Sequence, residues 1–150
     1  MTEAGASNFF IVWRTPSGQL ELVTAPLDDK IILAGITRQS VLDLARERFV
    51  TGSTHLDSNI KELTVVERKF TMVEVEKASE EGRIVEAFVS GTAFFITPVS
   101  VISFRDVDIK IPMDSEGTTG FYAKKIREWL TDIKYGNVQH EWGVIVDEDE

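Results

Sequence analysis

The sequence predicts an α+β fold in which a mixed or largely antiparallel sheet is flanked by helices. Segments with strand character outnumber segments with helix character, and the two kinds do not alternate regularly, which argues against a doubly wound parallel sheet. With 150 residues, of which 43% are hydrophobic, the chain can bury a core of ordinary size. No Gly/Ser-rich or Pro-rich linker divides it, so we expect residues 1–150 to form a single domain with an acidic tail over residues 146–150.

The expected strands are runs of aromatic and β-branched residues that end at turn-forming residues. The first two, residues 8–14 and 20–24, flank a Pro-Ser-Gly turn and should form a hairpin. A short buried strand is expected at residues 31–33. The later strands are expected at residues 63–70, 84–89, 94–104, 109–111 and 142–146.

Three segments repeat apolar residues at helical spacing. Thr37 can serve as the N-cap of the first helix. Thr71 and Glu74 form a capping box that opens the second helix, over residues 72–81. The third helix is marked by apolar residues between positions 121 and 133.

The composition excludes several classes of function. The chain has 25 acidic and 16 basic residues, a net charge of -9 and no cysteine. This charge repels nucleic-acid phosphates and anionic lipid, so we expect neither a nucleic-acid nor a membrane partner. The lack of cysteine excludes disulfides and thiolate metal sites, and the spacing of His55 and His140 predicts no metal site. No apolar run is long enough to span a membrane, and we expect an intracellular protein with its three tryptophans in the core.

The first segment suited to chemistry is residues 35–37, where a glycine turn leads into the first helix. The first N–H groups of a helix are unpaired, and the helix dipole makes them partly positive. Gly35, Ile36 and Thr37 could therefore hold a phosphate, with the Thr37 hydroxyl as a further donor. The alternative is that Thr37 only caps its own helix.

Two other segments are candidates. Residues 90–93, Ser-Gly-Thr-Ala, interrupt extended structure with small residues whose amides could hold a carboxylate or phosphate. The alternative is a bulge or a tight connection between strands. Glu3 is a lone carboxylate near the chain start, where the alternative is an ordinary solvated residue.

At these three places the sequence resembles the branched-chain amino acid aminotransferases, which are pyridoxal-phosphate enzymes of fold type IV in the class IV aminotransferase family. Eukaryotic members, and fungal ones in particular, are most similar. The resemblance implies the C-terminal half of such an enzyme, with the fold of the large pseudobarrel domain found in D-amino acid aminotransferase. The matching stretches are residues 2–10, 31–38, 67–72, 88–93 and 130–136.

The resemblance implies a site for pyridoxal 5′-phosphate. Its acidic residue would face the pyridine nitrogen, because a neighbouring carboxylate stabilises the protonated ring. Two anion sites would hold the cofactor phosphate and the substrate carboxylate, which fixes the substrate α-carbon over the ring. The implied cofactor-binding residues are Glu3, Gly35, Ile36, Thr37 and Thr92. The implied residues around the substrate carboxylate are Gly91, Thr92 and Ala93.

The sequence departs from the family at the catalytic lysine. In the family the Schiff-base lysine precedes the motif that contains Glu3, in sequence that this chain does not contain, and none of its lysines matches that position. No catalytic residue is therefore assigned here, and the chain is expected to be inactive alone. The positions of a redox Cys-x-x-C pair found in some animal members hold Phe94 and Thr97. A truncated gene model, a remnant and a split chain all stay open.

Three hypotheses of function follow. The first is transamination of valine, leucine or isoleucine with 2-oxoglutarate in branched-chain amino acid biosynthesis, in the cytoplasm or mitochondrion, with these amino acids and 2-oxo acids as partners. The second is a non-catalytic fragment that pairs with a full-length paralogue or forms a homodimer. The third is a small domain that binds an unrelated phosphate or carboxylate.

Overall fold

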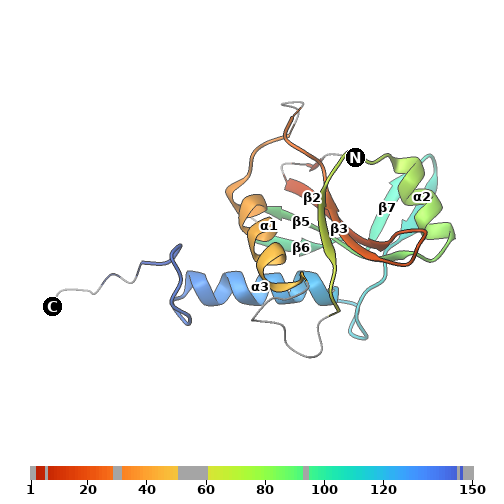
Figure 1. Cartoon of the computed structure of the whole chain (residues 1–150). Coiled ribbons are helices and arrows are strands. Elements are labelled where there is room, and N and C mark those ends of the chain that lie inside the picture. Colours follow the sequence, from red (N-terminus) through yellow and green to blue (C-terminus); the bar gives the residue numbers. More distant parts are fainter. Residues whose placement is uncertain are drawn as a thin grey trace.

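A mixed six-stranded sheet with helices on both sides forms the body of the molecule (Figure 1). The computed structural model describes residues 3–5, 7–28, 32–50, 61–92, 95–144 and 146. The α+β class and the mixed sheet are therefore confirmed. Among the described helices, none is long and apolar enough to cross a membrane.

The sheet has the strand order β4-β3-β2-β5-β6, and β1 pairs with the start of β2. β3 and β4 run parallel, whereas the other pairs are antiparallel. A separate antiparallel hairpin consists of β7 and β8. The strands are β1 (Glu3–Ala4), β2 (Ser7–Arg14), β3 (Leu20–Thr24), β4 (Thr64–Glu67), β5 (Ile84–Gly91), β6 (Phe95–Pro98), β7 (Val101–Phe104) and β8 (Val107–Lys110).

The expected β2–β3 hairpin is confirmed, and three other expectations change. The expected strand 94–104 is divided between β6 and β7, because the chain passes from one sheet to the other at Val99 and Ser100. The expected strand 63–70 is shorter, and the expected strand 109–111 begins earlier as β8.

Two short expected strands are wrong. Residues 32 and 33 form no strand, and Leu33 is 72% exposed, while residue 31 lies outside the described residues. Residues 142–144 form a turn and an irregular segment, closed by a hydrogen bond from Gly143 N to His140 O of 3.0 Å. Both segments are apolar, but each lies on the surface, where no neighbouring strand pairs with them among the described residues.

The helices are α1 (Ile36–Arg48), α2 (Met72–Glu80) and α3 (Phe121–Lys134). The capping box of Thr71 and Glu74 is confirmed on α2. The sequence predicted Thr37 as the N-cap of α1, and this prediction is wrong. Gly35 takes that position because its extended backbone lets its carbonyl accept the first helical hydrogen bond, from Gln39 N at 3.0 Å.

The sheet separates two apolar cores. Alternate side chains of β2 point to opposite faces: Phe10 and Val12 pack with α1 and α3, and Phe9 and Ile11 pack with α2 and the β7–β8 hairpin. The Phe10 and Phe88 rings stack with centroids 5.0 Å apart and fix β2 against β5. The full burial of each of these large apolar side chains contributes about 1.5–3 kcal/mol to the free energy of folding.

The expectation that all three tryptophans lie in the core is partly wrong. Trp13 is buried and Trp129 packs against the core. Trp142 is 42% exposed, because the segment that carries it forms no strand.

Candidate functional site

The first backbone N–H groups of α1 have no partner inside the helix. The first helical hydrogen bond comes from Gln39, so the N–H groups of Ile36, Thr37 and Arg38 precede it. Among the described residues no side chain caps this end, and its first turn carries no acidic residue. The Thr37 hydroxyl therefore does not cap its own helix, and no acidic side chain of the first turn compensates the helix dipole at this end.

The end of β5 carries a second group of small residues. Gly91 pairs with Phe95 across the connection to β6, which makes this a tight connection between antiparallel strands. Ser90 is 1% exposed, and its Oγ has no hydrogen-bond partner among the described residues. Thr92 is exposed, while Ala93 lies outside the described residues. A buried hydroxyl without a partner is costly unless something else binds it.

The third candidate, Glu3, lies in β1 and not in a free chain end. Its backbone pairs with Asn8 of β2, and Asn8 in turn pairs with Ser90 of β5. Since neighbouring strands lie about 4.8 Å apart, the backbones of Glu3 and Ser90 are separated by about 10 Å.

Asn8 also joins this row of strands to the start of α1. Its Nδ2 donates to Leu33 O at 2.9 Å. Its Oδ1 lies 2.5 Å from the point where a Cβ on Gly35 would be. The structure therefore brings Gly35, the backbone of Glu3 and the Ser90–Gly91 end of β5 together around Asn8. The sequence argument missed Asn8; its signal is a polar residue at the start of an otherwise apolar strand.

An ion pair that includes the buried Arg38 also holds the first turn of α1, through contacts that do not involve Asn8. Arg38 is 1% exposed and donates to Ala25 O at 2.8 Å and to Glu67 Oε2 at 2.6 Å. Arg46 donates to the other oxygen of Glu67, also at 2.6 Å. Burial raises the pKa of Glu67, but the hydrogen bonds and charges of the two arginines outweigh it, so this pKa is lowered. The first turn of α1 is thus tied to the residue after β3 and to β4.

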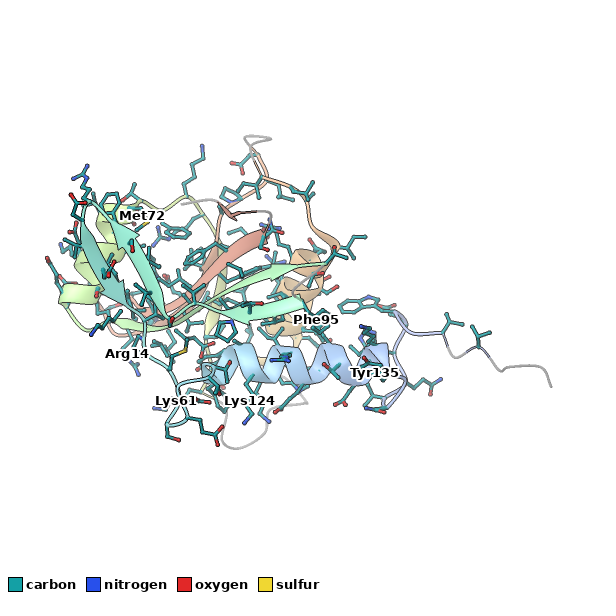
Figure 2. The ribbon with its side chains drawn as sticks, turned by 180° about the vertical axis from the view of Figure 1, so that it is seen from behind. Arg14, Lys61, Met72, Phe95, Lys124 and Tyr135 are labelled. Carbon is teal, nitrogen blue, oxygen red and sulfur yellow. The ribbon has the colours of Figure 1, made fainter. Side chains whose placement is uncertain are left out.

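A pocket of about 700 Å³ opens beside the start of α1. Ile36 and Thr37 line it, together with Phe95 of β6 and the end of α3. Figure 2 shows Phe95 beside α3 and Tyr135 at the carboxyl end of that helix. Lys134 lies in the pocket wall, with its Nζ 5.8 Å from the Phe95 ring centroid and 5.3 Å from that of Tyr135.

The predicted site residues do not all share this pocket. Gly35, Gly91 and Thr92 are not among its lining residues, although Gly35 precedes Ile36 in the chain and Gly91 pairs with Phe95. Groups of three or more potential metal-ligand side chains are absent from the described part of the chain.

Comparison with known proteins identifies the family to which this arrangement belongs. The profile of the family described as Amino-transferase class IV matches residues 1–102, which include β1, the start of α1 and the end of β5. The chain belongs to the class IV aminotransferase family. The resemblance read from the motifs is therefore confirmed.

Similar class IV proteins carry the name branched-chain-amino-acid aminotransferase. The protein of that name from Dictyostelium discoideum is 37% identical over 147 residues, which is 98% of this chain and 36% of the relative. The cytosolic protein from Saccharomyces cerevisiae is 40% identical over 148 residues, or 97% of this chain and 37% of the relative. The mitochondrial protein from Schizosaccharomyces pombe is 38% identical over 145 residues, or 96% and 32%. The chain thus spans about a third of these relatives, a smaller share than the half that the resemblance implied.

Proposed function

We propose that this class IV chain supplies the phosphate-binding and carboxylate-binding part of a branched-chain aminotransferase, which transfers the amino group of valine, leucine or isoleucine to 2-oxoglutarate. The observation that carries the proposal is the meeting of three segments around Asn8: the uncapped start of α1, the backbone of Glu3 and the end of β5. The names of the similar proteins support the choice of substrates.

The described residues fit pyridoxal 5′-phosphate. The N–H groups of Ile36 and Thr37 and the Thr37 hydroxyl would hold its phosphate, at the positive end of the α1 dipole. The Ser90 hydroxyl, which has no partner among the described residues, would be a further buried donor at the strand position paired with Asn8. When bound, this cofactor supplies an electron sink that lets the substrate lose its α-proton.

Two further groups of this chain would act on the bound molecules. Glu3 would keep the pyridine nitrogen protonated, since an opposite charge favours the charged form. The amides at Gly91, Thr92 and Ala93 would bind the substrate carboxylate, so that phosphate and carboxylate together orient the α-carbon.

The chain alone is proposed to be inactive, because none of its lysines matches the family's catalytic position. The test is a transaminase assay on the purified chain with leucine and 2-oxoglutarate. We expect no turnover above the cofactor-only reaction. Turnover comparable to that of a full-length relative would overturn this part of the proposal.

Binding of the cofactor tests the site directly. We expect weak, non-covalent binding of pyridoxal phosphate, reduced about three- to tenfold by Thr37→Ala and by Thr92→Ala, since each removes a hydrogen bond to the phosphate. Thr15→Ala, in the turn at the other end of β2, is the matched control and should bind like the wild type. Equal binding by all four proteins would contradict the assigned residues.

Borohydride reduction followed by mass measurement tests the absence of a catalytic lysine. We expect no specific adduct. A single adduct on one lysine, for example Lys134 in the wall of the pocket beside Thr37, would contradict the proposed inactivity.

A second function is favoured by apolar residues on the surface. Several large apolar side chains are exposed around the start of α1 and after α3, and such a patch is typical of an interface. We propose as the alternative a non-catalytic chain that pairs with a full-length relative or with a second copy. Light scattering on the chain, alone and mixed with a purified full-length relative, should then show a complex; a monomer in both samples would contradict it. The exposed apolar residues that suggest this interface are Leu33, Ile36, Tyr135, Val138, Trp142, Val144 and Val146.

A further inference from the structure

We propose that Asn8 is a positioning residue: it holds the 33–37 segment on the sheet so that the first N–H groups of α1 are fixed for a phosphate. The segment 33–37 consists of the irregular residues 33–35 and the first two residues of α1. This inference rests on the proposed function, which assigns the phosphate to Ile36 and Thr37. Asn8 itself would touch neither cofactor nor substrate.

The position of Asn8 in the sheet suits this role. It lies near the start of β2, paired on one side with Glu3 of β1 and on the other with Ser90 of β5. By the alternation along β2, its side chain lies on the same face as Phe10, toward α1. Asn8 is 5% exposed, so its amide is oriented by protein contacts and not by water.

Both ends of the Asn8 amide act on the 33–37 segment. Nδ2 donates to Leu33 O at 2.9 Å, and Gly35 N donates to the same oxygen at 2.8 Å. The Leu33 carbonyl therefore accepts two hydrogen bonds, one from the sheet and one from the segment itself. This pair of bonds fixes the segment three residues before Ile36, the first residue of α1.

Gly35 shows how closely the segment approaches Asn8. Its backbone angles, φ -68° and ψ 135°, are open to any residue, so glycine is not needed here for conformation. It is needed for space, because a Cβ would lie 2.5 Å from Asn8 Oδ1. A side chain at Gly35 would push the short, buried Asn8 amide or lift the start of α1 from the sheet.

The consequence should be specific to the phosphate. Arg38 ties α1 to Ala25 and Glu67 through contacts that do not involve Asn8. Loss of the Asn8 amide should therefore leave the helix in place and loosen only the turn before it. If the first N–H groups of α1 are displaced by a fraction of an ångström, they bind a phosphate much more weakly. Pyridoxal carries no phosphate, so its binding should not depend on these groups.

The experiment compares binding of pyridoxal phosphate and pyridoxal to the full chain carrying Asn8→Ala. We expect pyridoxal phosphate to bind about tenfold more weakly, as for loss of one buried hydrogen bond, and the affinity for pyridoxal to be unchanged. Thr24→Val is the matched control, because the Thr24 hydroxyl makes a buried hydrogen bond of 2.7 Å to Phe9 O without touching Gly35. It should lower stability and leave the ratio of the two affinities unchanged.

A second variant covers the case in which Asn8→Ala does not fold. Gly35→Ala alters the same contact from the other partner and keeps the strand pairing of Asn8. It should also reduce the preference for pyridoxal phosphate over pyridoxal. In the Asn8→Ala background the added Cβ has room, so there Gly35→Ala should reduce that preference by no more than about twofold.

Amide resonances of residues 33–37, measured without any ligand, separate this inference from the proposed function. Asn8→Ala should shift and broaden them far more than Thr24→Val does. Unchanged resonances would overturn the role of Asn8. So would an equal loss of affinity for pyridoxal phosphate and for pyridoxal in Asn8→Ala. A wild-type chain that binds neither compound would instead contradict the proposed function, while the resonances still decide whether Asn8 holds the segment.

Discussion

Arg38 and Glu67 form a nearly buried ion pair that the chain brings together from α1 and β4. Breaking such a pair by neutralising one partner leaves a buried charge without compensation. We predict that Glu67→Gln lowers the free energy of unfolding by about 2 kcal/mol, less than for a fully buried pair because Glu67 is 31% exposed. Arg46→Met, which removes the exposed contact to Glu67, should cost at most about 1 kcal/mol. Urea unfolding measures both, and equal effects would contradict the dominance of Arg38.

The ion pair of Arg38 and Glu67 also determines how the stability of the fold changes at acid pH. The pKa of Glu67 in the folded chain is lowered from its ordinary value of 4.5. Its contribution to stability is therefore present above pH 4.5 and is lost as the pH falls through the lowered folded pKa. We expect the stability of Glu67→Gln to fall less steeply with acid than that of the wild type; parallel curves would show that Glu67 ionises alike in both states.

At the scale of elements, α3 is capped by a side chain from a distant strand. Glu86 of β5 accepts from the N–H groups of Tyr122 at 2.9 Å and of Ala123 at 2.7 Å. Burial raises the pKa of Glu86, and these backbone hydrogen bonds offset part of that effect. We predict that Glu86→Ala destabilises the chain by about 2–3 kcal/mol, because two donors and a cavity are left behind. Glu76→Ala on α2 is the control, with a change within about 0.5 kcal/mol in urea unfolding; similar losses for both would contradict the cap.

Tyr122 gives α3 a dependence on alkaline pH. Its hydroxyl donates to Lys61 O at 2.9 Å, and burial, with the charge of Glu86, raises its pKa from 10.0 to about 12. A raised folded pKa adds stability below pH 10 that is lost as the pH rises toward 12. We predict that Tyr122→Phe is less sensitive to pH between 10 and 12 than the wild type, whereas the exposed Tyr135→Phe matches the wild type. Thermal unfolding over this range measures it, and identical profiles for all three would contradict burial of the phenol.

These elements show which features the sequence could predict. The capping box of α2 and the β2–β3 hairpin depend on residues close together in the chain, and both were predicted. Glu86 and Tyr122 are 36 positions apart in the sequence, and Asn8 and Leu33 are 25 positions apart. No local pattern therefore indicates these contacts. Apolar character alone also misplaced residues 32–33 and 142–144, since it cannot distinguish a core strand from an exposed segment.

The candidate site divides in the same way. Residues 35–37 and 90–93 could be proposed as site segments from composition and spacing, because both patterns are local. That these segments meet beside Glu3 follows from strand order, which only the motifs of a known family could suggest. The residues that hold the segments together, Asn8 and Arg38, are buried polar side chains whose partners lie elsewhere in the sequence.

At the scale of the whole molecule, the two cores share the strands β2 and β5, and this predicts one cooperative unit. Phe10 and Phe9 are neighbours in sequence yet lie in different cores, so neither core can open without disturbing β2. Trp13 reports on the core beside α2 and Trp129 on the core beside α1 and α3. We predict that two variants, each keeping one of these tryptophans and replacing the other and Trp142 by Phe, unfold in urea with fluorescence midpoints that coincide with their own circular dichroism midpoints. A fluorescence transition that precedes the circular dichroism transition in one variant would mean that its core opens separately, and that residues 1–150 do not form a single domain.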